Sequence, residues 1–377
     1  MDINGSGIRL FKSEYFSKRN LLLTVTAIIL MALAVFINAL YVRLNALDFL
    51  TTHNTGWYQG YTVPEGVEWY TVENERFGID STGGNARATT DGINAALIWA
   101  QQQGYAYIRF DKGIYLIQCN WQNRYKAPSD GILVPSGLTL DLGDSEFVIE
   151  PNSYPEYTIF GVVNQSDVTI LGGTLAGDKD RHVYAPSQSS PSHEFGFGIC
   201  VSASSNVLIQ GVTIRGMTGD GIILEGSYMP VAEGGRVSSQ VRILGCNISG
   251  CRRQGISVIG AADSEIAYNS ISFIKGTNPQ FGIDVEPDLD YIVDNLEIHH
   301  NVIAGCAGGA ISCHSGSNYQ VYDNACHGSL LAVKSSNVKI HGNLIEKGPL
   351  AVYPEASSIE LYDNSLKRGA REVIDGE

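Results

Sequence analysis

Between about Phe197 and Gly369 the chain repeats one short pattern of apolar and polar positions. Each copy begins with a strand of the Gly-Ile-x-Val type, passes through a polar turn into a second Val/Ile-rich strand, and ends on Asn or Gly before another apolar pair. The alternation within each strand predicts β-structure with one buried face. Seven first strands align, beginning at Gly198, Gly221, Gly255, Gly282, Ala310, Leu331 and Leu350.

A repeat of roughly 20 to 30 residues is typical of a solenoid, because no single copy can bury its apolar face without stacking on the next. An asparagine recurs at one place after the second strand, at Asn269, Asn301, Asn324, Asn343 and Asn364. Asparagine tolerates left-handed backbone, and stacked amides hydrogen-bond to one another. A leucine-rich horseshoe is excluded because its Leu-x-x-Leu-x-Leu frame is absent. We therefore predict an all-β fold, a single-stranded right-handed parallel β-helix.

The N-terminal segment has a different composition. Residues 21–42 are apolar apart from Thr24, Thr26 and Asn38, and are long enough to cross about 30 Å of hydrocarbon as a helix. Basic residues precede this segment more than they follow it, which predicts residues 1–20 in the cytoplasm and the β-helix outside a single-pass cell-membrane anchor. Residues 43–74 are then a linker and 75–377 the β-helix domain. A cleaved signal peptide is the alternative, and it too exports the domain.

The amino-acid composition limits which partners and which kinds of metal site we expect. The net charge of −14 argues against nucleic acid, which needs basic patches, but says nothing about a neutral glycan. The seven cysteines contain no CxxC pair, so no metal framework and no metal cofactor is expected. We expect buried thiols, with a Cys246–Cys251 bridge as the alternative.

The segment before the repeats has the order of a capping element. Phe77-Gly-Ile-Asp80 leads to Thr89-Thr90-Asp91, which we expect to cap a helix that ends at Gly104, and residues 107–117 follow as a strand, a turn and a strand. This order resembles the N-terminal cap of the pectate-lyase-like superfamily, which includes polygalacturonases, rhamnogalacturonases, pectate lyases and phage tailspike glycosidases. The helix is expected to cover the end of the solenoid.

Charged side chains gather in the middle copies, where the solenoid itself does not require them. If the Ile of each Gly-Ile pair points inward, Asp284 and Glu286 point outward from one strand, with Cα atoms about 7 Å apart. Asp220 and Gln254 share the position before the Gly, Arg253 is beside them, and His314 is expected one turn, about 5 Å, from Glu286.

Paired carboxylates on such a face are what glycoside hydrolysis needs, and their separation decides between retention and inversion. Asp284, Glu286 and Asp220 are the candidate acid and base. Candidate substrate-binding residues, including a rim of three from 178 to 182, are Arg253, Gln254, His193, Glu194, Asp178, Arg181, His182 and His314. Structural interpretations stay open for Asp220, which lies in an ordinary Gly-Asp-Gly turn, and for Arg253 as its ion-pair partner. An outward Asp within a strand is unfavourable, so Asp284 points more strongly to function.

From Phe77 to the end, the series His193-Glu194, Gly219-Asp220-Gly221, Arg253-Gln254-Gly255 and Gly282-Ile-Asp-Val-Glu286-Pro resembles a bacterial subgroup of the same superfamily. The resemblance implies polysaccharide cleavage. The polygalacturonase motifs Asn-Thr-Asp, Asp-Asp, Gly-His-Gly and Arg-Ile-Lys are absent, so that specificity does not carry over.

Three functions remain open from the sequence. The first is a membrane-anchored glycoside hydrolase acting on a polysaccharide, with the bilayer as its second partner. The second is a lyase or uronate epimerase in which Asp284, Glu286 and Asp288 bind Ca²⁺. The third is a glycan-binding module that does not cut. Whether three copies form a homotrimer, as tailspikes do, also stays open.

Overall fold

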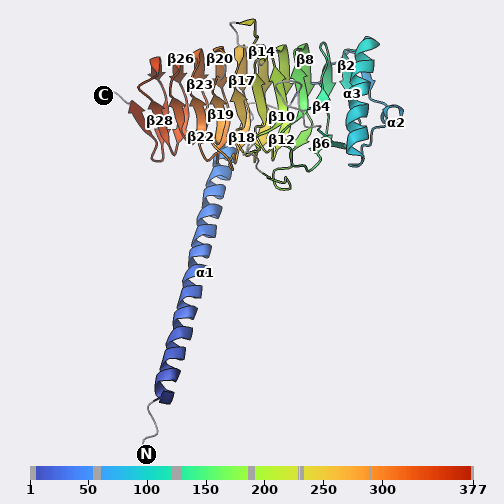
Figure 1. The fold of residues 1–377 in the computed structure, drawn as a ribbon. Coiled ribbons are helices and arrows are strands. Elements are labelled where there is room, and N and C mark those ends of the chain that lie inside the picture. The colour runs from blue at the N-terminus through green and yellow to red at the C-terminus, as the bar shows by residue number, and fades with distance from the viewer. Residues whose placement is uncertain are drawn as a thin grey trace, which may run out of the picture. The chain divides into compact units, whose positions relative to one another are not determined.

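The computed structural model of the chain describes residues 6–53, 61–119, 130–185, 192–227, 229, 233–287 and 291–374. The chain divides into two units, Met1–Asp48 and Phe49–Glu377. The first unit consists of helix α1 (Ser6–His53), which continues into the start of the second. From Leu23 onward α1 is long and apolar enough to cross a membrane. The second unit is a solenoid of parallel strands, drawn in Figure 1.

Three parallel sheets run along the solenoid, within the part of the chain that is described. The first sheet has eleven strands: β1 (Trp69–Thr71), β2 (Tyr107–Arg109), β5 (Thr139–Asp141), β8 (Ser166–Leu171), β11 (Ser205–Gln210), β14 (Ser238–Leu244), β17 (Ala261–Ala267), β20 (Val293–His299), β23 (Ser317–Tyr322), β26 (Ser336–His341) and β29 (Ser357–Tyr362).

The second sheet carries the candidate chemistry. Its ten strands are β4 (Asp130–Leu133), β7 (Glu156–Val163), β10 (Phe195–Ser202), β13 (Ile222–Glu225), β16 (Ile256–Val258), β19 (Phe281–Val285), β22 (Gly309–Cys313), β25 (Leu330–Ala332), β28 (Pro349–Val352) and β31 (Arg371–Ile374).

The third sheet has β3 (Ile114–Ile117), β6 (Glu146–Ile149), β9 (Thr174–Ala176), β12 (Thr213–Arg215), β15 (Asn247–Ser249), β18 (Ser270–Ser272), β21 (Val302–Ala304), β24 (Ala325–His327), β27 (Leu344–Glu346) and β30 (Ser365–Lys367). The predicted parallel β-helix is confirmed.

In the second sheet, the strand register places equivalent residues of successive turns next to one another. One inward column has no exposed surface and runs Ile199, Ile222, Ile256, Ile283, Ile311, Leu330 and Leu350. The predicted alignment was wrong in one copy, since it matched Leu331 rather than Leu330 with Leu350. Two leucines adjoin there, and the inward one is Leu330.

The predicted asparagine column is a continuous ladder of side-chain amides. Each Nδ2 donates to the Oδ1 of the next asparagine, at 2.9 Å from Asn269 to Asn301 and from Asn301 to Asn324, and at 3.0 Å on to Asn343 and Asn364. Each amide also donates to a backbone carbonyl, as Asn301 does to Ile266 at 2.9 Å. The ladder therefore satisfies buried backbone groups at the bend between the first and third sheets.

The N-terminal end of the solenoid is covered by α2 (Asn74–Phe77) and α3 (Ala86–Gln102), as predicted (Figure 1). The predicted Thr/Asp cap was wrong, because α3 begins at Ala86 and includes Thr89 to Asp91. Thr90 instead donates to the carbonyl of Ala86 at 2.8 Å, and Thr89 Oγ1 accepts from the amide of Asp80 at 3.1 Å. Gly104, at φ +83°, ends the segment as expected.

Two element boundaries differ from those predicted, and the cysteines form no disulfides. Residues 43–53 are helical rather than linker, and Trp69–Thr71 already pairs with β2, so the solenoid begins before residue 75. The seven cysteines all lie within the described ranges and none of them forms a disulfide, so Cys246 and Cys251 are not bridged. Six of them are buried, as expected for a reduced core.

The ladder predicts a position-dependent stability loss. Replacing the fully buried Asn301 by Ala removes the side-chain partner of the Asn269 backbone amide and of the Ile266 carbonyl, and breaks the ladder on both sides, at about 1–3 kcal/mol for each group left unsatisfied. We expect Asn301→Ala to lower the melting temperature by roughly 5 °C or more in calorimetry of the full chain. Asn364→Ala, at the half-buried end of the ladder, is the matched control and should lower it less. Equal losses in both variants would contradict the ladder's role.

Candidate functional site

The candidate site lies on the outer face of the second sheet, in the middle of the solenoid. The outward column there reads Cys200, Ile223, Ser257, Asp284, Ser312 and Leu331 in register. Ile223 belongs to a small apolar cluster outside the main core, with Phe197 and Cys200. Asp284 is therefore the charged position in this run of the column, as the sequence predicted.

A single guanidinium joins two of the predicted carboxylates. Arg253 Nη1 donates to Asp220 Oδ2 at 3.0 Å, and Arg253 Nη2 donates to Glu286 Oε1. Ser257 contacts both Asp220 and Arg253. Its Oγ donates to Asp220 Oδ2 at 2.9 Å and accepts from Arg253 Nη1 at 3.2 Å. The Asp220 side chain has no exposed surface, whereas the Glu286 side chain is 24% exposed.

Gln254 joins Asp284 to Glu286. Its Nε2 donates to Asp284 Oδ2 at 2.7 Å and to Glu286 Oε1 at 3.3 Å, and its Oε1 accepts from the amide of Phe281. Because both carboxylate oxygens contact one nitrogen, they lie within two hydrogen-bond lengths, roughly 6 Å, of each other. We call Asp220, Asp284, Glu286, Arg253, Gln254 and Ser257 the carboxylate cluster.

Burial changes the proton affinity of the two aspartates. Desolvation, reinforced by the negative charge of Glu286, raises the pKa of Asp284 to about 7. Desolvation also raises the pKa of Asp220 to about 6, although the charge of Arg253 opposes the rise. For Arg253 burial acts to lower the pKa, but Asp220 and Glu286 outweigh it and the pKa is raised. The cluster thus holds a fixed cation next to carboxyls that bind protons near neutral pH.

Three other predicted residues form a buried chain beside the cluster. The side chains of Asp178 and His182 have no exposed surface, and His193 is 3% exposed. His182 contacts Asp178 at 2.9 Å on one side and His193 at 2.9 Å on the other. These side chains are therefore not a surface rim, because their polar atoms face one another within the protein.

The remaining predicted residues relate to the carboxylate cluster in different ways. Glu194 is half-buried, and its charge acts on Arg253. His314 directly follows the strand partner of Val285, which places it next to Glu286 on an exposed surface. Arg181 is exposed and contacts Asp178 only through its backbone. Asp288, a member of the expected calcium set, lies outside the described residues.

Ser257 and Tyr157 are members of the neighbourhood that sequence reasoning missed. Ser257 occupies the same outward column as Asp284, so register alone could have found it. Tyr157, on β7, has its hydroxyl 3.2 Å from the amide of Thr218 and lies close to Asp178. No sequence signal distinguishes Tyr157 from an ordinary core tyrosine.

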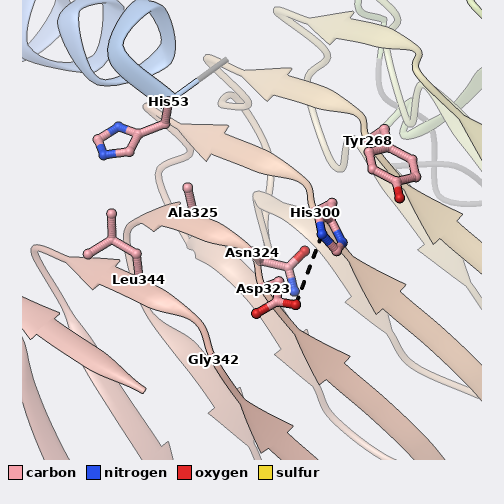
Figure 2. A pocket seen from close by; sticks show the side chains of 8 residues that line it. All are labelled: His53, Tyr268, His300, Asp323, Asn324, Ala325, Gly342 and Leu344. Atoms are coloured by element: carbon pink, nitrogen blue, oxygen red, sulfur yellow. Dashed lines mark ion pairs between the residues drawn. The ribbon is translucent and has the colours of Figure 1, made fainter. Parts of the chain in front are cut away.

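A second feature is a hollow of about 520 Å³ at the bend between the first and third sheets (Figure 2). Its lining residues are His53, Tyr268, His300, Asp323, Asn324, Ala325, Gly342 and Leu344. Figure 2 shows His300 facing Asp323, with Nε2 and Oδ2 4.0 Å apart. A column of stacked rings adjoins it, formed by His299, Tyr322, His341 and Tyr362 at centroid distances of 4.5–5.2 Å. These rings cover one another's faces, so we assign the column a packing role.

Comparison with known proteins agrees with the fold. Residues 234–373 match the family described as the right handed beta helix region. The uncharacterized protein YclG of Bacillus subtilis (strain 168) is 32% identical over 273 residues, which cover 69% of this chain and 46% of that protein. The SPbeta prophage-derived uncharacterized protein YorA from the same strain is 29% identical, covering 79% of this chain and 55% of its own. The chain spans about half the length of these curated relatives.

Among solved structures, a mutant tailspike protein of Escherichia coli bacteriophage HK620 in complex with a hexasaccharide is similar in fold. Its TM-score is 0.57 at 12% identity, over 85% of this chain and 63% of the tailspike. A second mutant of the same tailspike, with a pentasaccharide, gives a TM-score of 0.54. The chain has a right-handed parallel β-helix fold, and these similar proteins include ones that bind oligosaccharides.

The raised pKa of Asp284 predicts a pH-dependent stability cost. A proton bound more tightly in the folded state stabilises the fold fully below the unfolded pKa, near 4, and this stabilisation is lost as the pH rises through about 7. We expect Asp284→Asn to raise the melting temperature of the full chain by roughly 4 °C or more at about pH 8, with a smaller gain at about pH 5.

The control for this measurement is Asp144→Asn, whose side chain is 83% exposed and which should leave the melting temperature nearly unchanged at both pH values. A gain from Asp284→Asn that does not depend on pH, or a loss at about pH 8, would show that Asp284 does not hold a proton in the folded protein.

Proposed function

We propose that this protein is a carbohydrate-active β-helix enzyme that hydrolyses glycosidic bonds of a polysaccharide at the carboxylate cluster. The observation that carries the proposal is the contrast between Asp284 and Glu286, which share Gln254 but differ in charge environment. Asp284 is 3% exposed and has a pKa raised to about 7, whereas Glu286 is partly exposed and ion-paired with Arg253. Two carboxyl groups with opposed protonation are the chemical requirement of this reaction.

In the proposed reaction Asp284 is the general acid. It gives its proton to the glycosidic oxygen as the bond to the anomeric carbon breaks, so that the leaving sugar departs as an alcohol. Burial favours the protonated carboxyl, so Asp284 can still carry this proton near neutral pH when substrate binds. Glu286, as the carboxylate, faces the positive charge that develops at the anomeric carbon. Asp220 acts through Arg253, because it neutralises the guanidinium and fixes its position.

We propose that the reaction proceeds with retention. The bonds from Gln254 hold one oxygen of Asp284 within roughly 6 Å of one oxygen of Glu286, which is compatible with the carboxyl separation of about 5.5 Å in retaining enzymes. Glu286 would then attack the anomeric carbon and form a glycosyl ester. Water would release the sugar with Asp284 acting as base, which restores both carboxyl groups.

The calcium-dependent lyase or epimerase is less well supported by the residues present. Calcium takes carboxylate oxygens that are free to coordinate. Asp284 Oδ2 and Glu286 Oε1 instead accept N–H bonds from Gln254, and Arg253 adds a positive charge on Glu286. This donor set suits carboxyl groups that handle protons better than a cation site. A glycan-binding module without turnover remains the outcome to be separated by experiment.

We also infer a location for the active unit. Helix α1 exposes apolar side chains such as Ile29, Phe36 and Tyr41. Four basic residues precede its apolar part in the sequence, at positions 9, 12, 18 and 19, and Arg43 follows it closely. A single-pass anchor with the solenoid outside the cell satisfies both features. Protease added to intact cells should then cleave the solenoid, whereas protection until lysis would contradict this orientation.

A product assay tests the proposed activity. The full chain is incubated with a panel of neutral and uronate polysaccharides, and new reducing ends are read beside the ultraviolet absorbance of unsaturated products. We expect reducing ends without absorbance, lowered at least 100-fold in both Asp284→Asn and Glu286→Gln. Asp144→Asn, on an exposed residue outside the cluster and outside the candidate substrate-binding residues, is the control and should retain activity.

Other outcomes have distinct meanings. Absorbance that a chelator abolishes would favour the lyase. Retention of one glycan without any products would favour a binding module and overturn the hydrolase proposal.

A further inference from the structure

A buried chain of hydrogen bonds runs through the loop that precedes β10. Asp178 Oδ2 accepts from the amide of Asn152 at 3.0 Å and contacts His182 Nδ1 at 2.9 Å. His182 Nε2 contacts His193 Nδ1 at 2.9 Å, and His193 Nε2 contacts the carbonyl oxygen of Ala185 at 3.1 Å. We call Asp178, His182 and His193 the relay.

The three links of the relay are hydrogen bonds, and each of them requires one proton. The carbonyl of Ala185 only accepts, so His193 Nε2 must carry a proton, and the link between the two imidazoles needs a second. The link between His182 Nδ1 and Asp178 Oδ2 needs a third proton, which either of these two atoms can carry. An ionised aspartate and two neutral imidazoles supply only two protons. With all three links formed, the relay therefore holds one proton more than these two. Loss of that proton breaks one of the three links.

The surroundings indicate where this proton resides. Burial, together with the neighbouring His182 and Arg252, lowers the pKa of His193 despite its bond to the Ala185 carbonyl. Since a second proton is disfavoured on His193, the third proton belongs to the link between His182 Nδ1 and Asp178 Oδ2. Other titratable or charged groups facing the relay are Tyr157 on β7, Tyr184 and Asp180 in the same loop, and Arg252 before β16.

The relay is joined to the carboxylate cluster through the backbone that follows His193. Arg252 Nη1 donates to the carbonyl of Ser192 at 2.7 Å. The carbonyl of Glu194 packs so closely on Gly219 that a Cβ there would lie 2.2 Å from it. Gly219 immediately precedes Asp220, and its own carbonyl accepts from the amide of Arg253 at 3.0 Å. His193 itself has φ +49°, a conformation that its two ring contacts hold in place.

We propose that Asp178, His182 and His193 are positioning residues that form a proton-dependent clamp and hold Glu194 against the Arg253 side of the carboxylate cluster. The clamp requires no turnover, so it stands or falls separately from the hydrolase proposal. Its consequence for catalysis, a misplaced Glu194 at high pH, does rest on that proposal. Glu194 adds negative charge near the guanidinium that Asp220 and Glu286 share.

The isosteric variant Asp178→Asn separates the clamp from a merely structural role. With its amide nitrogen at the position of Oδ2, the side chain donates to His182 Nδ1 and gives up the bond that Asn152 makes to the same atom. With both imidazoles neutral, all three links then persist without an ionisable proton. The variant should keep the loop closed at every pH, whereas the natural protein should open it as the pH rises.

Hydrogen exchange of the full chain measures this directly, in peptides spanning 178–185 and 192–198, with rates corrected for intrinsic pH dependence. We expect protection in the natural protein to fall roughly tenfold between about pH 6 and about pH 9, the effect of losing one hydrogen bond. In Asp178→Asn it should stay flat. His193→Ala, which removes two links, should lower protection across the whole range.

Three results would overturn the clamp. Protection in the natural protein that does not depend on pH would exclude the additional proton. An equal fall in Asp178→Asn would assign the pH dependence to another group. A fall confined to 178–185, with 192–198 unchanged, would show that the relay does not position Glu194.

Discussion

The structure depends on the fixed spacing and register of parallel strands. Each turn of the solenoid places its inward Ile or Leu on that of the turn before, about 4.8 Å away, because only stacking buries the apolar faces. The same register carries outward residues with it. Ser257 and Asp284 are neighbours because Ile256 and Ile283 are neighbours. Residues that are separated by a whole turn of sequence thus form one site without any loop having to close over it.

That register also brings like charges together, which has an energetic cost. Asp220 and Glu286 share one guanidinium, Asp284 joins them through Gln254, and the two aspartates are almost fully buried. Removing carboxylates from water disfavours their charged form, so the aspartates take up protons instead of ionising at the usual pH. A long solenoid can tolerate this because its stability is spread over many turns. The cost is local, and it is the source of the proposed acid catalysis.

Sequence periodicity predicted the solenoid and the asparagine ladder because each follows from a local rule repeated many times, whereas the capping helix was predicted from start and stop signals and from the resemblance. It also selected Asp284, Glu286, Asp220, Arg253 and Gln254, which the structure brings into one hydrogen-bonded cluster. The sequence could not predict that Asp178, His182 and His193 bond to one another, since their contacts depend on how a loop folds back. Strand alternation offered no reason to choose Leu330 over Leu331, and only packing decides it. The cap at Thr89 failed because the helix starts one turn earlier.

The central claim is that the cluster stores protonated carboxyl groups at near-neutral pH. Carbon-13 NMR of the full chain labelled at aspartate side chains measures this most directly, with Asp284→Asn and Asp220→Asn assigning the two resonances. We expect titration midpoints near 7 for Asp284 and near 6 for Asp220. Midpoints close to 4 for both, as for aspartates in water, would contradict the claim and remove the proposed general acid.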